Sequence, residues 1–184
     1  MSLETGTKRL GLLRELLPQS SRVAVLINPN DPNAEHYTKA LQTAASTVGQ
    51  QVKFFSDRNI QEIDVAFANV TEWRPDALLV VAQGLLFNRR VQIVTQATFH
   101  ALPAIYPSSD FDDIGGLMGY GANAEDEFRL AGVYTGRILK GERPATLPVL
   151  RASKFEFVIN LQTAKTFGID IPSALVARAD KVIE

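Results

Sequence analysis

Side-chain amides cluster directly after the first long apolar segment of this chain, where they could bind a small polar molecule. Asn28, Asn30 and Asn33 surround two prolines. A helix beginning at the second proline would add free backbone N–H groups, which attract a carboxylate or another polar group. The alternative is structural, because Asn30 or Asp31 could cap that helix while the prolines stiffen the turn. A cap and a ligand site use the same position, so these residues leave both interpretations open.

A second candidate group follows a later apolar segment. Gln83 supplies an amide and Phe87 an aromatic ring, so the amide could hold the polar end of a ligand while the ring encloses an apolar part. In the alternative interpretation, Phe87 belongs to the core and Asn88 caps the next helix. Tyr106 and Tyr120 end two further apolar segments. Tyrosines at such positions bind ligands or serve as half-buried structural residues.

The sequence contains no arrangement typical of an enzyme or a metal site. It has no cysteine, and its two histidines, His36 and His100, lack the spacing of a zinc motif. Asp110, Asp112 and Asp113 form an acidic turn without the glycine and terminal glutamate of an EF-hand loop, which favours a solvated turn. Neither a Gly-x-Ser-x-Gly elbow nor a Gly-x-x-x-x-Gly-Lys phosphate loop occurs. We therefore expect no catalytic residue, no metal and no cofactor.

The composition is that of a globular protein. Of 184 residues, 46% are hydrophobic and 21% are charged, which is ordinary for a packed domain. The net charge is −1 with both signs interleaved, so the chain offers no basic surface for nucleic acid. No apolar run approaches the ~20 residues that span a bilayer. The first residues also lack the basic and apolar regions of a signal peptide.

Two kinds of apolar pattern alternate along the chain and predict its fold. Continuous apolar runs are typical of strands buried on both faces, and apolar residues spaced three and four apart are typical of helices. Because the connections are too long for hairpins, we predict an α/β fold with a parallel Rossmann-like (flavodoxin-like) sheet in a three-layer sandwich. The polar, turn-rich stretch 107–116 is the expected domain crossing. The expected strands are 22–28, 51–55, 77–81, 103–106, 117–120 and 155–159, and the expected helices are 8–17, 33–48, one capped by Asp57 or Asn59 that ends before Pro75, 89–101, 124–140, 163–167 and 173–179.

A series of loose motifs resembles the substrate-binding protein family of ABC transporters, whose members include aromatic amino-acid binders. The resemblance covers almost the whole chain, and the order and spacing of the motifs make it specific. The motifs are residues 8–10, 13–18, 22–26, 28–30, 103–106, 115–118, 120–121, 136–141 with Pro144, 147–149, 154–156, 158–161 and 163–165.

This resemblance implies a type I periplasmic-binding-protein fold, in which two α/β lobes joined by crossing segments hold a ligand between them. It further implies that the sequence begins after the opening strands of the first lobe. Residues 1–20 would then be a crossing helix, 21–107 the second lobe, 108–150 a crossing segment with a first-lobe remnant, and 151–184 a C-terminal strand and helices packing on the lobes. A remnant helix without its sheet favours a homodimer or domain exchange. The implied cleft positions are Asn28, Asn30, Asn33, Gln83, Phe87, Tyr106 and Tyr120.

The expected function is therefore non-enzymatic. The resemblance implies an importer component that binds a small organic solute such as an amino acid and delivers it to a membrane permease from a periplasmic or other extracytoplasmic location. Binding by this chain alone should be weak, because closure of two lobes buries most of a ligand's surface. Two other classes stay open: a ligand-sensing domain of a regulator or receptor, and an α/β enzyme that uses the same strand ends.

Overall fold

One seven-stranded sheet organises the described part of the chain, which in the computed structural model comprises residues 3–56, 60–150 and 152–184. Its spatial order is β2-β1-β3-β4-β5-β6-β7. The first five strands are parallel, β6 is antiparallel to β5, and β7 is parallel to β6. This order confirms the predicted flavodoxin-like sheet. The strands are β1 (Arg22–Ile27), β2 (Gln51–Ser56), β3 (Ala77–Val80), β4 (Ala104–Tyr106), β5 (Met118–Ala122), β6 (Phe155–Asn160) and β7 (Lys181–Ile183).

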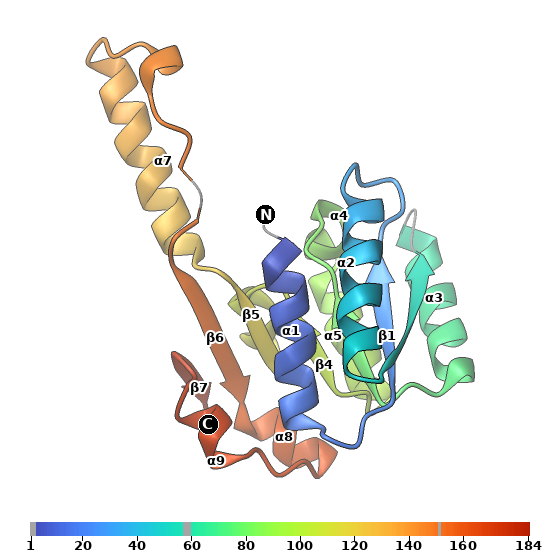
Figure 1. Ribbon diagram of the computed structural model, residues 1–184. Helices are drawn as coiled ribbons and strands as arrows, with labels where there is room; N and C mark the ends of the chain where they lie inside the picture. The colour runs from blue at the N-terminus through green and yellow to red at the C-terminus, as the bar shows by residue number, and fades with distance from the viewer. Residues whose placement is uncertain (1–2, 57–59, 151) are drawn as a thin grey trace.

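Helices cover both faces of the sheet and complete the three layers (Figure 1). On one face lie α1 (Leu3–Leu16) and α2 (Ala34–Thr47), with α8 (Leu161–Phe167) and α9 (Ser173–Val176) beneath β6 and β7. On the other face lie α3 (Ile60–Trp73), α5 (Arg90–Phe99) and α6 (Ser109–Asp112), while α4 (Gly84–Asn88) follows the end of β3. The proposed caps of α3, Asp57 and Asn59, lie outside the described residues.

The core consists of two hydrophobic clusters, one on each face. Along β1, Val23, Val25 and Ile27 pack toward α1 and α2, whereas Ala24 and Leu26 pack toward α3 and α5. Successive side chains of a strand point to opposite faces, so a strand covered on both sides must be apolar throughout. The continuous apolar run that predicted β1 is thus the direct result of its two-sided burial.

Four short elements were not expected from the sequence. These are α4, α6, the 3₁₀ helix η1 (Pro144–Thr146) and β7, each of three to five residues. Stretches of three to five residues are too short to show a helical or a strand periodicity, so the sequence pattern does not reveal them. The stretch predicted as a domain crossing contains α6, and β5 then joins β4 in the same sheet. The chain departs from the layered body only after β5 (Figure 1).

The segment that leaves the sheet is α7 (Ala124–Leu139) with the strap that returns from it, together called the arm (residues 124–150). Figure 1 shows the arm standing away from the layered body. Among the described residues, α7 buries only Asp126. Phe128 is 78% exposed, Leu139 82% and Val149 96%. The arm therefore exposes several large apolar side chains to solvent.

Candidate functional site

The carboxyl ends of β1 and β3 are tied together by a side-chain amide. The Asn28 backbone N–H donates to Oε1 of Gln83 at 2.5 Å, and Nε2 of Gln83 donates to the Asn28 carbonyl at 3.1 Å. This reciprocal pair continues the β1–β3 ladder beyond the point where Val81 N donates to Leu26 O. Gln83 is only 6% exposed, and its amide is engaged by this pair. The side chain therefore supports this part of the sheet from below. The carboxyl ends of β1 and β3, with residues 28–33 and 83–87 that follow them, are called the β1–β3 edge.

The loop after β1 is built from two side-chain turns. Oδ1 of Asn28 accepts from the Asn30 N–H at 2.9 Å, and Oδ1 of Asp31 accepts from the Asn33 N–H at 2.8 Å. Asn33 is the N-cap residue of α2, yet its own side chain forms no capping hydrogen bond. Asn30 and Asp31 were the predicted caps of this helix. They instead belong to the turns that precede its N-cap residue, Asn33. Asn30 and Asn33 are exposed at the mouth of α2.

Phe87 lies in α4 at the same edge and is 38% exposed. Its ring contacts Phe111 edge-on at 6.1 Å between centroids, and the Arg90 guanidinium lies 5.1 Å above it. Phe111 and Arg90 therefore cover part of the ring, and the rest is exposed. Arg89, not Asn88, is the N-cap residue of α5, which corrects the predicted cap.

Tyr106 is packed into the core. It is 1% exposed and stacks on Phe111 with the ring centroids 5.0 Å apart. Burial raises the pKa of the phenol well above its usual range, with a further contribution from the nearby Asp112 carboxyl. Tyr106 thus supports Phe111, which in turn supports Phe87.

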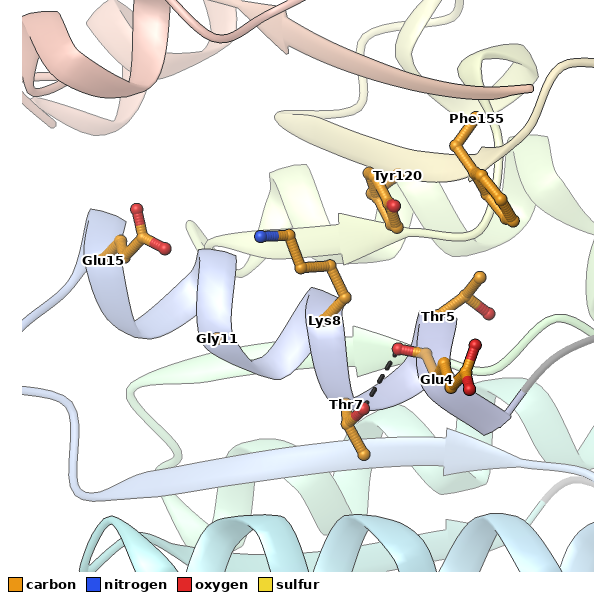
Figure 2. A pocket seen from close by; sticks show the side chains of 8 residues that line it. All are labelled: Glu4, Thr5, Thr7, Lys8, Gly11, Glu15, Tyr120 and Phe155. Carbon is orange, nitrogen blue, oxygen red and sulfur yellow. Dashed lines mark hydrogen bonds between the residues drawn. The ribbon is translucent and has the colours of Figure 1, made fainter. Parts of the chain in front are cut away.

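Tyr120 lies apart from the other candidates, in a groove between α1 and the β5–β6 pair. Figure 2 shows its ring beside Phe155, and the two stack with centroids 5.9 Å apart. The groove encloses about 470 Å³, and its α1 wall includes Thr5 and Lys8. The sequence-predicted residues are therefore divided: five frame the β1–β3 edge, Tyr106 lies in the core behind it, and Tyr120 lines the groove.

The predicted acidic turn is not solvated throughout. Oγ of Ser108 donates to Asp110, and Asp113 pairs with Lys181 at 2.6 Å. Asp112, by contrast, is 1% exposed, and neither of its carboxyl oxygens has a hydrogen-bond partner within the described chain. Burial raises the pKa of this carboxyl well above its ordinary value. The described residues contain no group of three or more histidine, aspartate or glutamate side chains that could hold a metal ion.

Sequence reasoning missed Arg9, which lies beneath the same edge. Its side chain is 1% exposed, and Nη1 donates to the Val80 carbonyl at 2.6 Å. Burial lowers the pKa of the guanidinium to about 10, partly opposed by Tyr37. In the sequence Arg9 occurs between Lys8 and Leu10 on an amphipathic helix. The one available signal was its place on the face that carries Leu13 and Leu16.

The sheet order and the polar groups at its carboxyl edge define an α/β protein with the type I periplasmic-binding-protein fold. A family model described as "ABC transporter substrate binding protein" matches residues 2–183. The chain belongs to this family. No curated protein matches it. None of the described helices is both long and apolar enough for a membrane span.

Solved structures share this fold. The chain is similar to a Streptococcus pneumoniae ABC domain in complex with L-Trp, with a TM-score of 0.87, 23% identity and coverage of 97% of this chain and 62% of that one. A conserved domain protein from Vibrio cholerae is similar with a TM-score of 0.87 and 22% identity, and the match covers 96% of this chain and 60% of that one. A ligand-free, open substrate-binding protein with adhesive properties from Clostridium difficile is similar with a TM-score of 0.68 and 22% identity. That match covers 96% of this chain and 59% of the other. The chain spans about three fifths of the length of these proteins.

Proposed function

We propose that this chain is the solute-binding part of an ABC importer and that its solute is an amino acid or a related small molecule. The observation that carries the proposal is the family match over residues 2–183. The L-Trp bound to the Streptococcus pneumoniae protein supports the choice of solute class. Delivery to a membrane permease, from a periplasmic or other extracytoplasmic location, follows from this role and is part of the proposal.

The β1–β3 edge is the proposed contact surface for the solute. Asn30 and Asn33 offer exposed amides beside the N-terminus of α2, and Phe87 offers a partly exposed ring. Gln83 and Tyr106 act from behind, by fixing the loop after β1 and by supporting the aromatic stack. Tyr120 extends the proposed contact surface into the groove beside α1.

The arm is the proposed link to a second lobe. In this proposal, residues 21–122 and 152–184 form one lobe, and the arm packs its apolar side chains into the other lobe, across a cleft above the β1–β3 edge. Supporting observations are the exposure of Phe128 and Leu139 and the fraction of each similar structure that this chain leaves uncovered. Without that cover, the same apolar face favours a homodimer or domain exchange between two copies.

A solute screen by NMR tests the proposal, because chemical shifts detect the weak binding expected of a single lobe. The ¹⁵N-labelled chain is titrated with a panel of L-amino acids and related acids, each to about tenfold above a millimolar Kd. We expect one chemical class to shift the backbone amides of residues 28–33 and 83–87. Phe87→Ala should weaken this response, whereas Phe99→Ala, at an exposed ring on α5, should leave it unchanged. If no panel member shifts the edge amides, the proposed function is wrong.

A further inference from the structure

Helix α6 carries two neighbouring side chains of opposite chemistry into the body of the protein. Phe111 is fully buried between Tyr106, on which it stacks, and Phe87, whose ring it contacts edge-on at the β1–β3 edge. The next residue, Asp112, is equally buried, and neither of its carboxyl oxygens has a hydrogen-bond partner within the described chain. Ionising a buried carboxyl without partners is costly. The charge state of Asp112 therefore affects the element that supports the edge.

The fit of α6 against β5 leaves the Asp112 carboxyl no room for water. A Cβ on Gly119 would overlap Oδ2 of Asp112, so the carboxyl fills the space that this glycine leaves open on β5. The Asp112 carbonyl is also held, because it accepts from Nδ2 of Asn160 at 3.3 Å and from the Gly115 N–H at 3.0 Å. Both carboxyl oxygens are shielded from solvent. They reach water only if α6 moves on β5.

Most charges near Asp112 oppose its ionisation. Burial is the first cause that raises the pKa of this carboxyl, and the negative charge of Asp113 is the second. Lys181 acts in the opposite direction, but its ammonium group is paired with Asp113 at 2.6 Å. The four charged groups that act on Asp112 are Asp110 and Asp113 on α6, Glu156 on β6 and Lys181 on β7. Three of these four are acidic, so an ionised Asp112 is more stable where water reaches it.

The other elements packed on α6 bring no compensating cation to Asp112. On β4, the Tyr106 phenol is neutral near pH 7, because burial raises its pKa. Strand β5 carries no acidic or basic residue. The charged residue of α5 is Arg90, whose guanidinium lies over the Phe87 ring. Movement of α6 is therefore the available response to a negative charge on Asp112.

We infer that α6 is a pH-dependent support of the β1–β3 edge. With Asp112 protonated, α6 stays against β5 and Phe111 holds the Phe87 ring. When Asp112 releases its proton to solvent, α6 shifts outward, and the ring stack that ends at Phe87 shifts with it because Phe111 is the preceding residue. The inference goes beyond the proposed function, since it gives the edge a response to pH that is independent of the solute.

A pH titration of the ¹³C,¹⁵N-labelled chain without solute tests the inference by NMR. The side-chain carboxyl carbon of Asp112 reports its ionisation directly, and the backbone amides of residues 84–88 report on α4, which carries Phe87. Between pH 4 and pH 9, we expect both signals to change with one shared midpoint, above the ordinary aspartate value of about 4. Asp112→Asn should abolish this change in the amides of residues 84–88.

Two further variants give the inference a direction and a control. Asp113→Asn removes a neighbouring negative charge and releases Lys181, so it should lower the shared midpoint by about one pH unit. Asp170→Asn, at an exposed site, should leave the midpoint unchanged. Both histidines are present in every variant, so their contributions cancel in the comparison.

An Asp112 carboxyl that stays protonated up to pH 9 would overturn the inference, and so would an ionisation that leaves the amides of residues 84–88 unchanged. A change in these amides that persists in folded Asp112→Asn would also overturn it, because another group would then be responsible. If Asp112→Asn does not fold, an unchanged midpoint in Asp113→Asn overturns the inference. None of these measurements includes a solute, so their outcome is distinct from that of the solute screen.

Discussion

Replacing Asp112 by asparagine should make this chain more stable at neutral pH. The side chain lies on α6 against the sheet, almost fully buried, with both carboxyl oxygens unpaired within the described chain. Its pKa is raised first by burial and then by the charge of Asp113, with smaller contributions in the same direction from Glu156 and Asp110. Lys181 acts in the opposite direction but is itself paired with Asp113. The native state therefore favours the protonated acid.

The sign of the effect follows from which state releases its proton first. The unfolded chain loses the Asp112 proton near pH 4, the ordinary value for aspartate, whereas the native chain retains it to higher pH. Between these two pKa values the native state binds one more proton than the unfolded state, so the free energy of unfolding falls by about 1.4 kcal/mol per pH unit. Above the native pKa the loss is complete and constant. Asparagine cannot ionise, so the variant avoids the whole loss.

The assay is urea unfolding, followed by circular dichroism at half-unit steps from pH 4 to pH 8. The difference in free energy of unfolding between Asp112→Asn and the wild type should be near zero at pH 4 and then rise in favour of the variant. Carboxyls with lowered pKa values, such as Asp76 and Asp126, act on both proteins equally and cancel in this difference. Asp170→Asn, at an exposed site, controls for the change in net charge. Parallel curves for wild type and Asp112→Asn would refute the reasoning, because the native carboxyl would then ionise as freely as the unfolded one.

Four further substitutions test the site, the sheet and the arm. Gln83→Leu removes both hydrogen bonds to the Asn28 backbone and should lower the free energy of unfolding, measured by urea unfolding, by about 1–3 kcal/mol. A loss below about 0.5 kcal/mol would show that this pair of hydrogen bonds is dispensable. Gly121→Ala would place a Cβ 1.8 Å from a backbone carbonyl and should cost about 3 kcal/mol or more, whereas Gly132→Ala on α7, with open space around it, should be neutral or stabilising by up to about 1 kcal/mol. Phe128→Ser should weaken self-association by about tenfold in sedimentation velocity without lowering the melting temperature; an unchanged sedimentation profile would show that the exposed face of the arm is not the contact.

Much of the sheet could be predicted because its strands are buried on both faces. The run 23–27 is apolar throughout, and Leu78 and Leu79 pack into opposite clusters in the same way. Long parallel crossovers then fix the strand order within narrow limits. Helix α2 was equally predictable, since Tyr37, Leu41 and Ala45 form one buried face and Gly49 follows with positive φ.

The direction in which each strand-end side chain points was harder to predict. Tyr106 follows Ile105 on a three-residue strand, and the two pack into opposite clusters. When both faces of a sheet are covered, the sequence does not determine toward which face a given side chain points. A tyrosine in the core and a tyrosine in a cleft therefore have the same sequence pattern. Tyr120 has the same ambiguity on β5, and there the structure places the side chain in the groove next to α1.

Use of a polar group by the backbone is equally invisible in a sequence. Gln83 was predicted from its residue type, but its partner is the main chain of Asn28, which lies 55 residues earlier. Arg9 was missed because a single arginine on an amphipathic helix normally faces water. Its burial depends on the tertiary contact with the Val80 carbonyl, 71 residues away. Local pattern carries no information about partners at such separations.

Two buried polar side chains, Arg9 and Gln83, lie at the carboxyl ends of β1 and β3, where stability alone gives no reason for them. An apolar side chain at position 9 would fill the space under α1 without the desolvation cost of a guanidinium, and an apolar residue at position 83 would leave the β1–β3 ladder to end at Val81. Both positions instead carry groups that fix the geometry and the charge of one edge. Departures from the burial rule that converge on one place are expected at functional sites. These two positions support the proposal that the solute binds at the β1–β3 edge, and the exposed apolar side chains of the arm support its proposed role as the contact with a second lobe.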